Sequence, residues 1–135
     1  MRSPRFASRA AQVAPPKPYG AVPSQRHLKW HELEFYCFIH FTTNTFTDKE
    51  WGYGDEKPSD FKPTECNPRQ WVEIAKEVGM KAVIPTCKHH DGFCLFDSEY
   101  TTYDAHDLVG RDLCKEITDA IRAEGLKVGY YHSVI

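Results

Sequence analysis

The sequence lacks the features that mark several large classes of protein. No apolar run approaches the roughly 20 residues of a membrane-spanning helix, so we expect no membrane span. The N-terminus has basic residues but no apolar signal core, and its faint likeness to a transit peptide leaves the compartment open. A glycine-rich phosphate loop is also absent, which argues against nucleotide chemistry.

Metal-binding motifs are missing as well. The sequence contains no C-x-x-C and no H-E-x-x-H, and its five cysteines show no zinc-binding spacing. His89 and His90 are adjacent, and neighbouring residues on a strand point to opposite sides, so they would not easily share one ion. We expect free, mostly buried thiols, no metal and no cofactor, while a metal-dependent hydrolase stays open as an alternative.

The charge is small and unevenly distributed. The formal net charge is −2, yet residues 1–18 hold four basic residues and no acid, which leaves a net charge of −6 on the remainder. This negative net charge argues against nucleic acid as a partner, because the phosphate backbone binds basic surfaces.

Proline and glycine divide the chain into a leader and a body. Residues 1–26 are rich in Pro, Ala, Ser and Arg, which is typical of a disordered or extended segment. The regular patterns begin after this segment, so we expect a leader at 1–26 and one structured region at 27–135.

Strand patterns recur three times in the body. Residues 35–41 form a continuous apolar and aromatic run, as expected for a strand buried on both faces. Residues 81–87 form a second buried run, in which Pro85 removes a ladder donor and predicts a bulge or an irregular strand end. Residues 126–133 form the third, with Gly129 inside it.

Two helical patterns separate these strands. The first begins after Asn67 and Pro68, with Gln70 in a variant of the capping box, and it ends at Gly79. The second covers about 112–124 and ends at Gly125. The predicted apolar faces are Trp71, Ile74, Ala75 and Val78 on the first helix, and Leu113, Ile117, Ala120 and Ile121 on the second.

This order of elements indicates an α/β fold with a parallel sheet. Helices between strands imply right-handed crossovers, and a complete (β/α)₈ barrel needs roughly 250 residues. We therefore expect the N-terminal three β-α units of a (β/α)₈-like barrel, incomplete in this chain.

Polar and aromatic side chains gather where the predicted strands end, the edge that carries active sites in such folds. They are His40, Glu50, Trp51, Lys88, His89, His90, Asp91, Tyr131 and His132. Imidazole and indole groups suit sugar hydroxyls, because they combine a donor or acceptor with an apolar face. Structural alternatives stay open: His40 as a core histidine, Trp51 as a cover of the barrel mouth, and Asp91-Gly92 as a turn.

Two strings of residues resemble the family 29 glycoside hydrolases, the α-L-fucosidases. One runs Asn-Thr-Phe-Thr-Asp-Lys-Glu-Trp-Gly at 44–52, and the other runs Lys-His-His-Asp-Gly-Phe-Cys-Leu at 88–95. Shorter matches occur at 38–41 and 129–133, and the resemblance extends from about Pro15 to the last residue.

The resemblance implies retaining hydrolysis of terminal α-L-fucosyl residues from fucosylated glycans. It places six residues at the fucose-binding subsite: His40, Glu50, Trp51, His89, His90 and Tyr131. It puts the nucleophile and the acid/base residue beyond residue 135, and it suggests a periplasmic, secreted or lysosomal protein. A fucose-binding remnant without catalysis is the other alternative to an enzyme.

Overall fold

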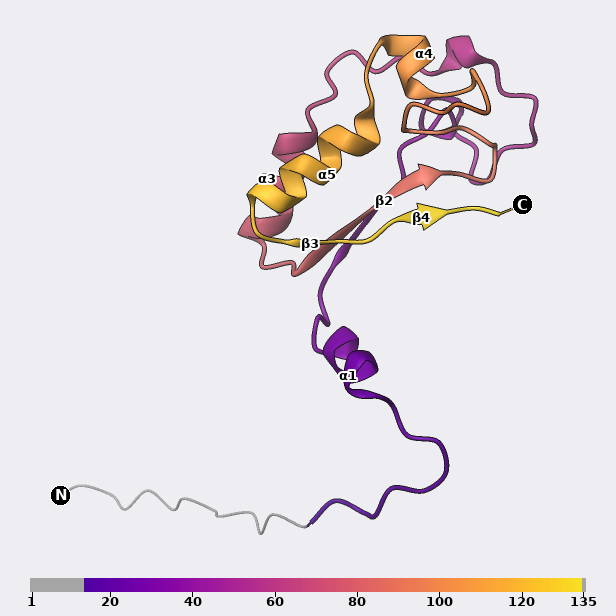
Figure 1. Ribbon diagram of the computed structural model, residues 1–135. Coiled ribbons are helices and arrows are strands. Elements are labelled where there is room, and N and C mark those ends of the chain that lie inside the picture. The colour runs from indigo at the N-terminus through magenta and orange to yellow at the C-terminus, as the bar shows by residue number, and fades with distance from the viewer. Residues whose placement is uncertain (1–13, 135) are drawn as a thin grey trace, which may run out of the picture.

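The computed structural model describes residues 14–134, which form a small α/β unit with an N-terminal extension (Figure 1). The elements in chain order are α1 (Gln25–His31), β1 (Cys37–Ile39), α2 (Asn44–Thr47), the 3-10 helix η1 (Pro58–Asp60), α3 (Pro68–Glu77), β2 (Ala82–Lys88), α4 (Ala105–Val109), α5 (Leu113–Ala123), β3 (Lys127–Val128) and β4 (Tyr131–His132).

The sheet is parallel, as the sequence predicted. β2 lies in the centre, with β1 on one side and with β3 and then β4 on the other. Helices α3 and α5 lie side by side over one face of this sheet (Figure 1). Because every strand runs in the same direction, their carboxyl ends share one edge.

The first strand is shorter and more exposed than predicted. β1 comprises Cys37–Ile39 rather than 35–41, and Phe38 is 44% exposed. Phe35 and Tyr36 are exposed too. In the described part of the chain β1 pairs with β2 alone, and the helices cover one face of the sheet. The prediction of burial on both faces is therefore wrong for these residues.

Helix α3 begins where the sequence indicated, but it buries a different stripe. The Asn67 side chain accepts a hydrogen bond from the Gln70 N–H, and Pro68 occupies the first turn. Ile74 and Val78 are more than half exposed, whereas Val72 is fully buried. The 3.6-residue period fixes the width of an apolar stripe, while the contacts with α5 decide which of its edges faces inward.

Helix α5 buries the apolar face that the sequence predicted. Asp112 caps the helix by accepting from the Lys115 N–H, and Leu113, Ile117 and Ile121 have no exposed surface. These side chains form the core with the following buried residues of α3, β2, α4 and the loops: Phe61, Val72, Ala75, Val83, Phe93, Leu95 and Ala105.

The irregularity expected at Pro85 is present, whereas the third strand, predicted as one continuous run, is interrupted. The register between β2 and β4 shifts between Thr86 and Lys88, just after Pro85. The third predicted strand is divided into β3 and β4 around Gly129, where a β-carbon would lie 3.1 Å from the Ile84 side chain. Gly129 thus permits close approach of the third strand to β2.

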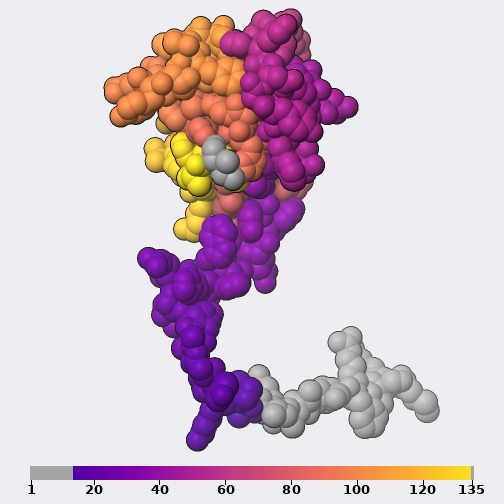
Figure 2. All heavy atoms as spheres, turned by 90° about the vertical axis from the view of Figure 1, so that its right-hand side faces the viewer, coloured from indigo at the N-terminus to yellow at the C-terminus, as the bar shows by residue number. Residues whose placement is uncertain are grey.

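The remaining helices were not predicted. α2 and η1 lie in the loop after β1, and α4 lies in the loop after β2. Helix α1 follows an extended, exposed stretch that projects away from the compact body (Figure 2). Residues 1–13 of the expected leader lie outside the described residues. Between residues 14 and 134, no helix is long and apolar enough to cross a membrane.

Candidate functional site

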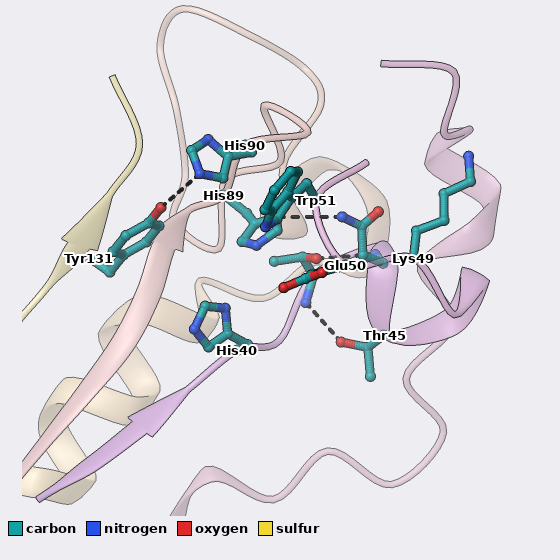
Figure 3. A pocket seen from close by; sticks show the side chains of 10 residues that line it. His40, Thr45, Lys49, Glu50, Trp51, His89, His90 and Tyr131 are labelled. Carbon is teal, nitrogen blue, oxygen red and sulfur yellow. Dashed lines mark hydrogen bonds between the residues drawn. The ribbon is translucent and has the colours of Figure 1, made fainter. Parts of the chain in front are cut away.

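A cavity of about 510 Å³ lies at the carboxyl edge of the sheet (Figure 3). The loop after β1, the end of β2 and strand β4 form its wall. Its lining residues are His40, Thr42, Asn44, Thr45, Lys49, Glu50, Trp51, His89, His90 and Tyr131. The structure thus brings together all six residues that the sequence analysis placed at the subsite.

These six residues reach the cavity from three separate segments of the chain. His40 directly follows β1, while Glu50 and Trp51 lie on the loop beyond α2. His89 and His90 follow β2, and Tyr131 belongs to β4. The parallel register of β1, β2 and β4 is therefore what assembles the site.

Aromatic rings form one side of the site. The Phe38 ring lies 4.2 Å from the His40 ring and 5.3 Å from the Tyr131 ring, measured between centroids. The His40 ring meets the His89 ring edge-on at 5.6 Å. Trp51 also lines the cavity, is 63% exposed and offers a large apolar surface. His40 is exposed, which excludes the alternative of a core histidine in the described structure.

His89 is the most deeply placed imidazole of the site, with 3% exposure. Its Nδ1 atom lies 3.4 Å from the Asn44 amide nitrogen, which can only donate, so Nδ1 acts as the acceptor. Burial lowers the pKa of His89, and the nearby Asp91 carboxylate opposes that effect. The ring is therefore held neutral, with its proton on Nε2.

His90 is held from both of its ring nitrogens. Nδ1 lies 2.8 Å from the Ser133 hydroxyl, and Nε2 lies 3.2 Å from the Tyr131 hydroxyl (Figure 3). Both partners come from the β4 segment, so these contacts link the end of β2 to the neighbouring strand. They fix the orientation of an otherwise exposed side chain.

Asp91 anchors the loop from beneath the cavity. One carboxylate oxygen accepts from the Thr43 hydroxyl at 2.7 Å, and the other accepts from the Phe93 N–H at 2.9 Å. Since Thr43 gives its single proton to Asp91, the Tyr103 hydroxyl 2.9 Å away must donate to Thr43. Asp91 does occupy a turn, in agreement with the structural alternative. Its hydrogen bond with Thr43 also connects the loop after β2 to the start of α2.

A second buried carboxylate organises the loop that carries Trp51. Glu56 accepts from the Tyr53 and Gly54 N–H groups and from Lys49, and its side chain is 1% exposed. Burial alone would raise the pKa of Glu56, but these hydrogen bonds outweigh it and bring the pKa to about 2. The loop is therefore closed around a permanent negative charge at neutral pH.

Four lining residues were not singled out from the sequence: Thr42, Asn44, Thr45 and Lys49. Three of them belong to the string at 44–52 that carried the family resemblance, so that string held the signal. Asn44 is the most informative, because its buried Oδ1 atom has no hydrogen-bond partner. The amide nitrogen of Asn44 faces His89 Nδ1, so Asn44 helps to orient that ring.

The chemistry of the lining is that of a polar small-molecule site. Imidazole, amide, hydroxyl and ammonium groups converge with aromatic faces, the combination that binds sugars and other polyols. Glu50 is the one acid among the lining residues within the described chain. Within residues 14–134, no cluster of His, Cys, Asp and Glu is arranged to hold a metal ion.

The sequence matches one protein family over most of its length. The model of the family described as alpha-L-fucosidase matches residues 19–135. The chain is 45% identical to alpha-L-fucosidase 1 of Arabidopsis thaliana over 122 residues, which cover 87% of this chain and 24% of that protein. It is 41% identical to the human plasma alpha-L-fucosidase over 108 residues, 78% of this chain and 23% of that protein.

Solved structures agree with the sequence matches. A glycoside hydrolase family 29 member from an unknown rumen bacterium aligns with a TM-score of 0.78 and 43% identity, over 86% of this chain and 22% of that one. A Ruminococcus gnavus family 29 fucosidase mutant, solved in complex with fucose, aligns with a TM-score of 0.75 and 35% identity, over 84% and 24%. The chain thus spans about a quarter of the length of these relatives.

Proposed function

The chain belongs to the alpha-L-fucosidase family, and from this membership we propose that it forms the fucose-binding part of a retaining α-L-fucosidase. Residues 27–135 correspond in this proposal to the first three β-α units of a (β/α)₈-like catalytic barrel. The substrate is a fucosylated oligosaccharide or glycoconjugate. The observation that carries the proposal is the convergence of His40, Trp51, His89 and His90 on one cavity.

The cavity offers what a deoxy-hexose requires. Fucose presents hydroxyl groups that need fixed hydrogen bonds, and the proton on Nε2 of His89 provides a donor. Its methyl group needs an apolar surface, which the exposed Trp51 ring on the cavity wall supplies. Glu50 adds an acceptor for a further hydroxyl.

The catalytic carboxylates are proposed to lie on later segments of the full-length enzyme. Retaining hydrolysis uses two carboxyl groups about 5 Å apart, one as the nucleophile and one as the acid/base residue. Glu50 has no second acid beside it on the described cavity wall. Asp91 is buried and already accepts two hydrogen bonds, so it serves as an anchor and not as a nucleophile.

The test compares residues 1–135 with a version extended to the length of its relatives. We expect the extended protein to release the phenol from an aryl α-L-fucoside and the short chain to show no turnover, because positioning without the carboxylates gives binding alone. In the extended protein, His89→Ala and Trp51→Ala should raise the KM, and Tyr100→Phe, at a 96% exposed residue away from the cavity, should not.

Three outcomes would overturn parts of this proposal. Strong turnover by residues 1–135 would show that the short chain contains the catalytic groups. An extended protein that hydrolyses other glycosides but not fucosides would refute the substrate. Activity that is lost in EDTA and restored by a metal ion would favour the metal-dependent hydrolase instead.

A further inference from the structure

Two of the five cysteines face each other outside the sugar cavity. Cys87 lies near the end of β2 and Cys114 lies in the first turn of α5, and their Sγ atoms are 3.1 Å apart. The other three cysteines, Cys37, Cys66 and Cys94, have no sulfur contact of this kind among the described residues. Disulfide bonds require Sγ atoms about 2 Å apart, so an approach of about 1 Å would close the bond.

The backbone holds these two cysteines together independently of their side chains. The Leu95 N–H donates to the Cys87 carbonyl at 2.8 Å, and the Cys114 N–H donates to the Leu95 carbonyl at 2.9 Å. Leu95 is fully buried and so fixes the spacing between β2 and the start of α5. Cys87 is 6% exposed, and Cys114 is partly buried.

The two thiols differ in reactivity. The hydrogen bond from the Cys87 thiol lowers the pKa of Cys114, while that contact and burial raise the pKa of Cys87. Cys114 is thus the more readily ionised of the two, and the thiolate is the nucleophile in disulfide exchange.

We propose that Cys87 and Cys114 form a reversible intramolecular disulfide, with a small-molecule disulfide such as oxidised glutathione as the oxidant. The Cys114 thiolate attacks one glutathione sulfur and releases the other glutathione as a thiolate. The Cys87 thiol then loses its proton and attacks Cys114, the mixed disulfide breaks, and a second reduced glutathione leaves. The cysteines are oxidised by two electrons and the glutathione disulfide is reduced by two. The bond fastens α5 to the strand end that leads into Lys88 and His89.

The sequence permits a direct test, because trypsin separates all five cysteines. Cys87 falls on peptide 82–88, Cys94 on 89–111 and Cys114 on 112–115, with Cys37 and Cys66 on 30–49 and 50–69. The chain is equilibrated in glutathione buffers from reducing to oxidising, its free thiols are alkylated, and the digest is analysed by mass spectrometry. We expect peptide 82–88 linked to 112–115, lighter by two hydrogens, and released by dithiothreitol.

Variants separate a specific pair from random oxidation. Cys94→Ser should keep the link, whereas Cys114→Ser should abolish it and leave Cys87 open to alkylation. Thermal melting gives a second measurement: the oxidised wild type should melt at a higher temperature than the reduced one, and Cys114→Ala should melt at one temperature in both buffers. Pairing of Cys87 with Cys94, a stable glutathione adduct at Cys114, or full alkylation of both thiols in every buffer would overturn the proposal.

Discussion

Gly52 packs directly against Asp91: a β-carbon added at Gly52 would lie 2.7 Å from the Asp91 Cβ. The loop that carries Trp51 therefore packs against Asp91. Gly52 also has a positive φ of 77°, which side chains other than glycine adopt only with strain. This close approach joins the two loops that form the site.

The first prediction is that Gly52→Ala destabilises the fold. Steric overlap with Asp91 adds to the backbone strain, so we expect a loss of about 2–4 kcal/mol in the free energy of unfolding. The matched control is Gly54→Ala, because Gly54 has a φ of 78° but a β-carbon there would meet no atom within 4 Å. It should lose only about 1 kcal/mol. If urea unfolding gave equal losses of stability for Gly52→Ala and Gly54→Ala, the contact with Asp91 would not contribute.

The second prediction concerns acid stability through Glu56. Its pKa of about 2 in the folded state lies below the unfolded value of 4.5, so its stabilising effect is complete above pH 4.5 and is lost as the pH falls toward 2. The full contribution is about 3 kcal/mol. Glu56→Gln should lower stability at pH 7 and flatten the profile between pH 4.5 and 2. A Glu56→Gln profile as steep as that of the unchanged chain in this pH range would contradict the prediction.

The third prediction concerns the coupling between Thr43 and Asp91. Replacing Asp91 by Asn puts an amide where the Thr43 hydroxyl needs an acceptor, and we expect a loss of about 1–3 kcal/mol. Thr43→Val should lose about 1 kcal/mol, and the double variant should lose less than the sum of both. Asp97→Asn, with an exposed side chain, should change stability by less than about 0.5 kcal/mol. Strictly additive losses in the cycle would refute the coupling.

The fourth prediction is that His89 remains neutral below the usual pKa of histidine. Because burial lowers its folded pKa, the unfolded chain binds the proton more readily, and stability falls as the pH drops below 6.5. His89→Gln should remove that part of the pH dependence. NMR titration of the imidazole signals measures the pKa directly, and a His89 midpoint at or above 6.5 would contradict the lowered pKa.

The fifth prediction rests on the proposed function. Tyr131→Phe removes the hydroxyl that lies 3.2 Å from His90, so His90 loses one of its two fixed contacts. In the extended enzyme we expect fucose affinity to fall about 10-fold, which is about 1.4 kcal/mol. Calorimetric titration with fucose measures it, and Tyr130→Phe, one residue away with its hydroxyl near Thr118, serves as the control. An unchanged affinity would show that the Tyr131 hydroxyl does not contribute to fucose binding.

The order of the main elements could be predicted from local patterns. The cap at Asn67, the apolar stripe of α5 and the three apolar runs depend on residues near one another in the chain, so the sequence alone indicated them. Short elements such as α4 could not be found this way, because five residues carry too little periodicity. The burial of Phe38 was also mispredicted, since exposure depends on which elements cover a strand and not on its own composition.

For the site too, some features could be predicted from the sequence and others depend on tertiary contacts. The sequence by itself determined that His40, Trp51 and the His89-His90 pair follow strand ends, and a parallel sheet obliges such residues to share one edge. Only the tertiary structure decided that Asn44 joins them, that Asp91 lies beneath the cavity as an anchor, and that Cys87 meets Cys114. These are contacts between segments 27 to 48 residues apart, and their geometry is set by how the loops pack after the strands have paired.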